Sequence, residues 1–89
     1  MKPSTEIETQ LRQLIAYELS LKESSVLLQS RLIEDLGADH FDIPDLVEAI
    51  ERVFKITIQN NEVEKLKTVS EIVEFIVSTK KTELFTLQV

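Results

Sequence analysis

Carboxylates and the chain's one imidazole gather in a single stretch, from Glu34 to Phe54. The stretch holds seven acidic residues, and no Lys or Arg occurs between Arg31 and Arg52. It also holds His40, the only His of the chain. Groups of these types can act as acids or bases, coordinate a metal, or bind a cationic partner. The seven acidic residues are Glu34, Asp35, Asp39, Asp42, Asp45, Glu48 and Glu51.

Catalysis by His40 would require a second catalytic group, and metal binding would require further ligands. The sequence supplies neither in a suitable form. A catalytic imidazole works with a nucleophile or a second base, and the chain has no Cys and no other His. A metal needs several suitable ligands, and one imidazole with flexible carboxylates is a weak set. We therefore predict no catalytic residue, no metal site and no enzyme activity. His40 is expected to be a solvated surface side chain, with a pH-sensitive contact as the alternative.

Recognition of a basic protein is the chemistry that the acidic stretch suits best. The net charge of −6 disfavours nucleic acid, whose phosphates are bound through clustered Lys and Arg, and it disfavours anionic membrane surfaces. No apolar run approaches the ~20 residues of a membrane-spanning helix. With no Cys and no apolar leader at its start, the chain is expected to be cytoplasmic, and we expect a monomer.

The acidic stretch is predicted to form a helix with one apolar and one acidic face. From Asp45 onward, apolar residues recur at helical spacing, which places them on the buried side and turns the carboxylates to water. Pro44 fits only the first turn of a helix. The helix is therefore expected to begin near Asp42, capped by that carboxylate, or to have a distorted first turn over 40–43. Its apolar side is predicted to comprise Leu46, Ala49, Ile50, Val53 and Phe54.

Three further helices are predicted around this one, in an all-α bundle that forms a single domain over 1–89. A composition with one Gly and two Pro, rich in Leu, Glu, Lys and Ile, favours helices. The spacing of apolar residues predicts helices over about 5–19, 62–66 and 69–79. The candidate caps at their starts are Ser4 or Thr5, Asn60 or Asn61, and Thr68 or Ser70, in that order.

Two segments lie outside these helices. The connection over 20–38 is long for a compact domain, so we expect one helical turn around 30–33. Residues 80–89 are predicted to form a tail beyond a helical core of about 5–79, with Lys80 and Lys81 at the end of the last helix. The tail is expected to fold back or to be partly disordered; the alternative is that it docks on a neighbouring molecule. The residues expected to pin the connection are Leu27, Leu28, Leu32, Ile33 and Leu36.

The acidic stretch also resembles the attachment loop of acyl carrier proteins. The hexapeptide Glu34-Asp35-Leu36-Gly37-Ala38-Asp39 is similar to the loop that directly precedes the Ser bearing 4′-phosphopantetheine in that family. The similarity continues through the acidic helix and returns at 62–66 and 72–76, so that it covers roughly 5–79. It implies the family's four-helix bundle: three longer helices, one short helix, and a long loop between the first two helices.

The resemblance places His40 where the family has its attachment Ser. In the family, the arm is joined to that Ser through a phosphodiester on the side-chain hydroxyl. An imidazole cannot form this ester, and Ser24, Ser25 and Ser30 do not match the attachment position. We therefore predict that the chain has no cofactor, although its family implies 4′-phosphopantetheine.

The acidic helix of the family docks onto basic patches of synthases, reductases and transferases. The resemblance implies that this chain's helix docks in the same way on acyl-processing or assembly proteins. Arg52 stands where the family often has another acid, and Glu48 stands where an apolar contact is typical. The implied partner-binding residues are Asp39, His40, Phe41, Asp42, Ile43, Asp45, Val47, Glu48 and Glu51.

The predicted function is that of an acyl-carrier-like interaction protein that docks as a scaffold, regulator or decoy. One alternative is a genuine acyl carrier protein of fatty-acid, polyketide or related biosynthesis, in which the attachment Ser has been replaced. The other is non-covalent binding of a fatty acid or other lipid within the bundle, although stripes of Leu and Ile more often form plain core.

Overall fold

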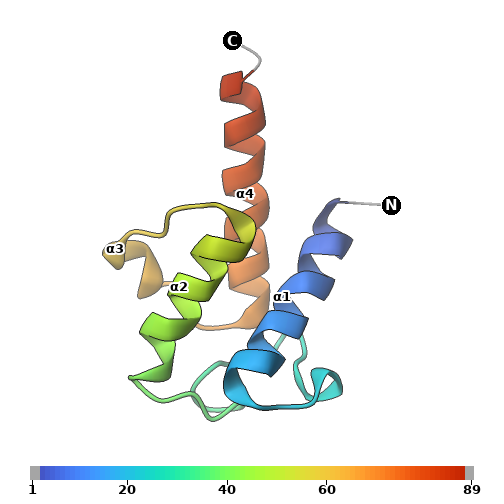
Figure 1. Ribbon diagram of the computed structural model, residues 1–89, viewed down its shortest axis with the longest axis vertical. Helices are drawn as coiled ribbons and strands as arrows, with labels where there is room; N and C mark the ends of the chain where they lie inside the picture. The colour runs from blue at the N-terminus through green and yellow to red at the C-terminus, as the bar shows by residue number, and fades with distance from the viewer. Residues whose placement is uncertain (1–2, 88–89) are drawn as a thin grey trace.

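The computed structural model describes the backbone of residues 3–87 and the side chains of residues 5–81. Helix α1 packs against both α2 and α4 (Figure 1), and no β-sheet occurs within the described backbone. The predicted all-α bundle with three longer helices and one short helix is therefore confirmed. The elements are α1 (Pro3–Leu19), the 3-10 helix η1 (Glu23–Ser25), α2 (Asp42–Phe54), α3 (Asn60–Val63) and α4 (Val69–Leu87).

The core is formed by the apolar stripes that the helical spacing predicted, with one exception. Leu11 and Ile15 of α1 are fully buried, and so are the central positions of α2 and α4. Val53 was predicted on the buried side of α2, but 46% of its surface is exposed. Phe54, which is 5% exposed, helps to fill the core at this end of the helix. The largest side chains with less than 2% exposure are Leu11, Ile15, Val26, Leu46, Ile50, Val69, Ile72 and Ile76.

Helix α1 begins at Pro3, which places Ser4 and Thr5 inside the helix. The prediction that one of them caps it is therefore wrong. A Pro suits the first position of a helix, because the amide hydrogen that it lacks would have no partner within the helix there. Tyr17 is 81% exposed and lies off the apolar stripe of α1.

The connection between α1 and α2 is fastened to the segment that joins α3 to α4. The amide of Leu32 donates to the carbonyl of Lys67 at 2.9 Å, and the amide of Val69 donates to the carbonyl of Ser30 at 3.1 Å. The predicted helical turn lies slightly later than expected, because the amides of Asp35 and Leu36 both donate to the carbonyl of Arg31. The buried apolar side chains of the connection are Val26, Leu32, Leu36 and Ala38. Leu27, Leu28 and Ile33, which were also expected to anchor it, are exposed.

The short α3 begins earlier than predicted, at Asn60, and ends at Val63. Neither Asn60 nor Asn61 caps it, because both lie within the helix. The residue before the helix is Gln59, whose amide donates to the carboxylate of Glu62 at 3.1 Å. This contact ties the start of α3 to its own first turn.

Helix α4 begins with a reciprocal cap between Thr68 and Glu71. The Thr68 hydroxyl accepts from the amide of Glu71 at 3.2 Å, and the Glu71 carboxylate accepts from the amide of Thr68 at 2.9 Å. Two orphan amides at the helix start are satisfied in this way. The predicted cap at Thr68 is confirmed, and Ser70 lies inside the helix.

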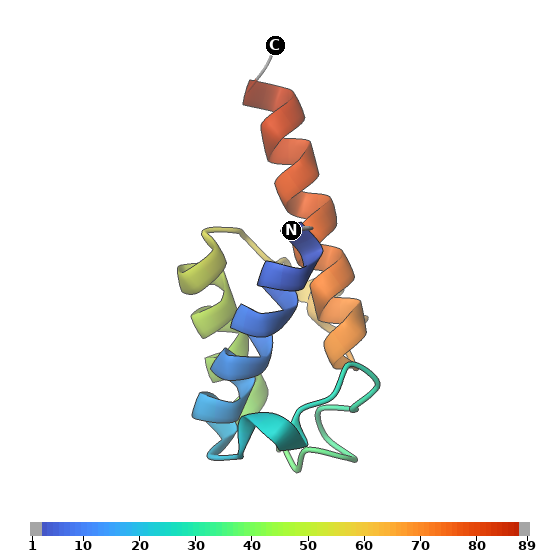
Figure 2. The same ribbon diagram turned by 90° about the vertical axis from the view of Figure 1, so that its right-hand side faces the viewer.

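Helix α4 does not end at Thr79 but continues to Leu87, so the predicted end of the helix is wrong. The sequence after Thr79 contains no Gly or Pro that would terminate a helix. Lys80 and Lys81 therefore lie inside α4, and the backbone of residues 80–87 continues the helix rather than folding back. Figure 2 shows these last turns extending beyond the other helices. The side chains after Lys81 and the last two residues lie outside the described part of the chain, as does the predicted docking of the tail.

The cap of α4 makes stability depend on pH. The backbone amide and then the hydroxyl of Thr68 donate to Glu71 and hold the pKa of this carboxyl below its usual value of 4.5. A carboxyl with a lowered folded-state pKa stabilises the fold above its unfolded pKa, and this contribution disappears as the pH falls through the folded value. We expect the free energy of unfolding to decrease on acidification below about pH 4.5, and to decrease less in the Glu71→Gln variant.

Urea unfolding followed by circular dichroism at a series of pH values measures this effect. The matched control is Glu74→Gln, which removes an equal charge from the same helix outside the cap. Equal pH slopes for Glu71→Gln and the unaltered chain would contradict the prediction.

Candidate functional site

The start of α2 is fixed by two carboxylates that accept hydrogen bonds from backbone amides. Asp39 accepts from the amides of Phe41 and Asp42, both at 2.9 Å, and Asp42 accepts from the amide of Asp39 at 3.0 Å. The residue directly before α2 is Phe41, whose side chain makes no capping hydrogen bond, and the amide of the first helical residue, Asp42, is instead satisfied by Asp39. The prediction that the carboxylate of Asp42 caps the helix is wrong, because this carboxylate accepts from the amide of Asp39, outside the helix. The helix begins at Asp42 as predicted, with His40 and Phe41 in a turn before it. Pro44 is the third helical residue, where its missing amide hydrogen costs no hydrogen bond within the helix.

The carboxylates of the predicted docking residues divide into two groups. Asp39 and Asp42 hold the start of α2, and Glu51 accepts from the backbone amide of Ile58 at 2.9 Å. Asp45 and Glu48 are exposed, and neither carboxylate takes part in a hydrogen bond or ion pair within residues 5–81. We define the outer face of α2 as Asp45 and Glu48. These two carboxylates are available to an external cation, whereas the other three already organise the chain's own backbone.

The apolar members of the predicted docking set also differ in their surroundings. Phe41 stands at the head of α2 with 86% of its surface exposed. Ile43 and Val47 are half-buried and pack against the core. Phe41 is therefore the apolar side chain that a partner can cover most completely, next to the outer face.

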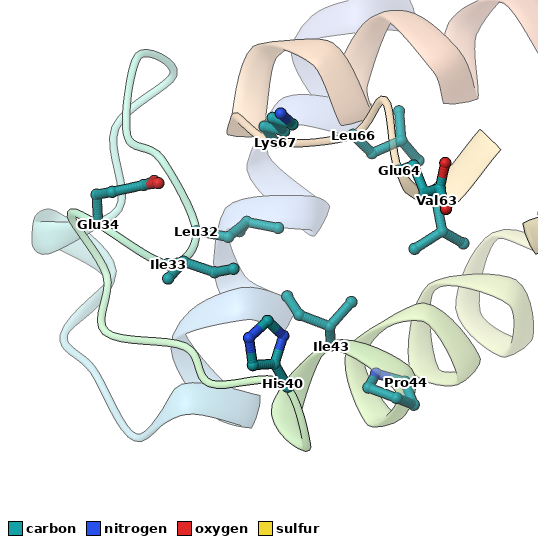
Figure 3. Close-up of a pocket in the computed structure, with 10 residues that line it drawn as sticks. All are labelled: Leu32, Ile33, Glu34, His40, Ile43, Pro44, Val63, Glu64, Leu66 and Lys67. Atoms are coloured by element: carbon teal, nitrogen blue, oxygen red, sulfur yellow. The ribbon is translucent and has the colours of Figure 1, made fainter. Parts of the chain in front are cut away.

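His40 is exposed, and its ring lies in a groove between the start of α2, the connection before it and α3 (Figure 3). The ring points toward Ile33 and Ile43. The groove has a volume of about 540 Å³, and sequence analysis did not predict it because its sides come from three separate segments. Its lining residues are Leu32, Ile33, Glu34, His40, Ile43, Pro44, Val63, Glu64, Leu66 and Lys67.

No Ser, Thr or Tyr is among the residues that line this groove. The Ser residues of the connection between α1 and α2 do not supply a hydroxyl to the groove. Ser30 is buried and its hydroxyl accepts from the amide of Leu27 at 3.1 Å, while Ser24 and Ser25 lie in η1. The groove beside His40 therefore offers no side-chain hydroxyl to a phosphodiester.

Neither a metal-binding cluster nor a membrane-spanning helix occurs in the described part of the chain. Within residues 5–81, no group of three or more His, Cys, Asp and Glu side chains lies close enough together to hold a metal ion. Among the described helices, none has the length and apolar character that crossing a membrane requires.

Beneath the groove, the interior of the bundle is closely packed. A cavity between α2, α3 and α4 has a volume of only about 10 Å³, which is about the space that one water molecule needs. It is lined by side chains such as Leu46, Ile50 and Ile72. The groove beside His40 is therefore far larger than this cavity beneath it.

Comparison with known proteins identifies the family. Residues 9–76 match the family described as "Phosphopantetheine attachment site". The chain is 38% identical to an acyl carrier protein of Campylobacter fetus subsp. fetus, over 81% of this chain and 94% of that protein. It is 40% identical to an acyl carrier protein of Clostridium perfringens, over 82% of this chain and 93% of that protein. It is 39% identical to an acyl carrier protein of Campylobacter concisus, over 74% of this chain and 86% of that protein. The family match and these relatives together show that the chain belongs to the acyl carrier protein family, whose members are carriers and not enzymes.

Proposed function

We propose that this chain is an acyl-carrier-family protein that acts by docking and bears no phosphopantetheine arm. It docks through the outer face of α2 onto basic patches of acyl-processing or assembly proteins. It works in the cytoplasm as a monomer. Two features support the proposal: the resemblance of 34–39 to the family's attachment loop, which puts His40 in place of the attachment Ser, and two exposed, unengaged carboxylates on α2.

The family implies a 4′-phosphopantetheine arm as cofactor. The side chain at position 40, an imidazole, cannot be the attachment point of this arm. A phosphodiester requires a side-chain oxygen, and the groove around His40 offers only imidazole, amine, carboxylate and apolar groups. The hydroxyl of Ser30 is buried and hydrogen-bonded, so it is not a substitute. We therefore derive no step that passes through an attached acyl group.

Docking is supported by the charge and exposure of α2. Asp45 and Glu48 are exposed, and Phe41 adds a large apolar surface at the head of the helix. A basic patch meets charge of opposite sign there, which speeds encounter and sets orientation. Because the carboxylates are exposed, salt screens the attraction, with a Debye length of about 8 Å at physiological ionic strength.

The competing function is that of a genuine carrier whose attachment Ser has been replaced. The length of the match favours this competing function, because the match covers 94% of the Campylobacter fetus protein. The bundle therefore retains the family scaffold, and restoring a hydroxyl at position 40 distinguishes the two functions. Lipid binding within the bundle receives less support, because the interior cavity holds only about 10 Å³.

Charge reversal on the outer face tests the docking. The variant Asp45→Lys/Glu48→Lys is expected to bind a ketoacyl synthase with a basic carrier-binding surface about 10- to 100-fold more weakly, since like charges then face each other. Isothermal titration calorimetry at low and physiological salt measures this loss. The control is Glu23→Lys/Glu74→Lys, which changes the net charge equally at two exposed positions on other elements.

Two results would contradict the proposed docking. One is equal weakening by the outer-face variant and the control variant. The other is an affinity for the synthase that does not change with ionic strength.

A further inference from the structure

One side of α4 carries a charge of each sign next to a groove along α1. Glu74 and Lys81 are both exposed, and between them lie the half-buried Val77 and the exposed Ser78. These four positions share one side of the helix, because residues three, four and seven apart lie on the same face. We call them the α4 stripe. They line a groove of about 390 Å³, to which α1 contributes Glu8.

The two charges of the α4 stripe have no partner within the chain. The side chains of Glu74 and Lys81 take part in no hydrogen bond or ion pair within residues 5–81. Seven residues of helix span about 10.5 Å, which is beyond the spacing at which ion pairs form along one helix. A carboxylate and an ammonium group with this spacing match a second stripe of the same kind that runs in the opposite direction.

The sequence continues the α4 stripe with apolar residues. Its next positions are Leu84 and Phe85, three and four residues after Lys81. Helix α4 extends to Leu87, and Figure 2 shows its last turns reaching beyond the other helices. These turns also lie outside the family match, which ends at residue 76. The charged part of the stripe thus lies on the bundle, and its apolar continuation lies on the extension.

A second set of exposed apolar residues lies at the other end of α4. Leu27 is 47% exposed and Leu28 is 37% exposed. They lie beside the start of the helix, because the amide of Ser70 donates to the carbonyl of Leu28 at 2.9 Å. Each end of α4 therefore has apolar residues available for contact, with the two charges between them.

We propose that two copies of this chain pair through their α4 stripes in an antiparallel arrangement. A two-fold axis that passes between Val77 and Ser78 sets Glu74 of each copy opposite Lys81 of the other. Two ion pairs form in this way, and Glu8 adds a further carboxylate to the groove that receives each Lys81. The contact is isologous, because the same residues serve both copies, and it closes at two copies.

The same axis brings the two apolar ends together. Phe85 of one copy falls opposite Ser70 of the other, at the end of α4 where Leu27 and Leu28 are exposed. Exposed ion pairs add little affinity, so the apolar contact supplies most of the affinity and the charges fix the register. One helix from each copy forms the contact, which places it among the small, transient interfaces. We expect pairing only above about 0.1 mM.

This pairing is independent of the proposed docking function. The α4 stripe and the outer face of α2 belong to different helices and share no residue. The monomer proposed for docking is in equilibrium with the pair, and the pair becomes populated as the concentration of the chain rises.

Two single charge reversals test the register. In Glu74→Lys, two Lys residues face each other at both ion pairs, and in Lys81→Glu two Glu residues do. We expect each variant alone to self-associate at least about tenfold more weakly than the unaltered chain. In an equimolar mixture of the two variants, opposite charges face each other again, and association is expected to return to within about threefold. Sedimentation equilibrium over a range of concentrations measures these values.

The controls for the charge reversals are Glu23→Lys and Lys65→Glu. They change the net charge by the same amounts at exposed positions outside the α4 stripe. We expect each to change self-association by less than about threefold, and their mixture to bring no recovery. Circular dichroism checks that every variant keeps its helical content.

The apolar contact is tested by Phe85→Ser, with Leu87→Ser as its control. Leu87 lies on the same extension, but helical spacing places it off the α4 stripe. We expect Phe85→Ser to weaken self-association about tenfold and Leu87→Ser to weaken it less than about threefold.

Several results would overturn the inference. A chain that remains monomeric at about 1 mM does not form the pair. Single reversals that associate as well as the unaltered chain indicate a parallel arrangement, in which Glu74 faces Glu74. A mixture that fails to recover contradicts the register, and equal losses for Phe85→Ser and Leu87→Ser contradict the apolar contact. If the chain stays monomeric and binds phosphatidylglycerol vesicles through Phe85, the extension belongs to a lipid surface.

Discussion

The His40→Ser variant is expected to gain one phosphopantetheine group when it is co-expressed with a broad-specificity phosphopantetheinyl transferase. The substitution restores the alcohol oxygen that the phosphodiester requires, in an exposed turn directly before α2. The surrounding scaffold is already that of the family over residues 9–76. Because the change supplies the reacting atom itself, the expected effect is all or none. Intact-mass spectrometry of the purified protein measures it.

The matched control for this experiment is Phe41→Ser. It places a hydroxyl one residue further along the same turn, at a position that is 86% exposed. We expect this variant to remain unmodified, because the transferase reads one position in the loop. The prediction fails if His40→Ser stays unmodified under conditions that load an acyl carrier protein of Campylobacter fetus, or if both variants are loaded.

The Leu46→Ala variant is expected to lose about 2–5 kcal/mol of unfolding free energy. Leu46 is 1% exposed and lies in the middle of the core contacts of α2, so truncation leaves a cavity among side chains that cannot fully collapse. The loss is a large part of the roughly 5–15 kcal/mol that stabilises a typical domain. Since α2 carries the proposed docking residues, binding of the synthase is expected to decline at the temperature where the variant unfolds.

Val53→Ala is the control, and urea unfolding measures both variants. The sequence pattern places Val53 and Leu46 on the same side of α2, but Val53 is 46% exposed in the structure. Its truncation is expected to cost less than about 1 kcal/mol. A loss for Val53→Ala as large as that for Leu46→Ala would contradict the packing described for this end of the helix.

The fold was predictable because burial follows a simple period in these helices. Leu46 and Ile50 of α2, and Ile72 and Ile76 of α4, lie where the 3.6-residue spacing put them. The end of α4 was not predictable from Lys80 and Lys81. Cations are favourable near a helix end, but they do not terminate a helix.

The acidic character of the candidate site was predictable. Which of its carboxylates bond the chain's own backbone, and which remain available to a partner, was not. The sequence shows the carboxylates, yet it does not show which backbone amides they reach. Glu51 is tied to Ile58 only because the chain after α2 turns back past it, and Asp39 is tied to Asp42 by the local turn. The groove was missed for a related reason, since Glu34 and Glu64 line the same groove only after the connection has been fastened to the segment before α4.

The most direct measurement is the intact mass of the unaltered chain after co-expression with the same transferase. Because we propose that His40 occupies the attachment position, we expect the bare polypeptide mass of 10.2 kDa and nothing added. A stoichiometric, thiol-terminated group covalently bound to the unaltered chain would contradict it.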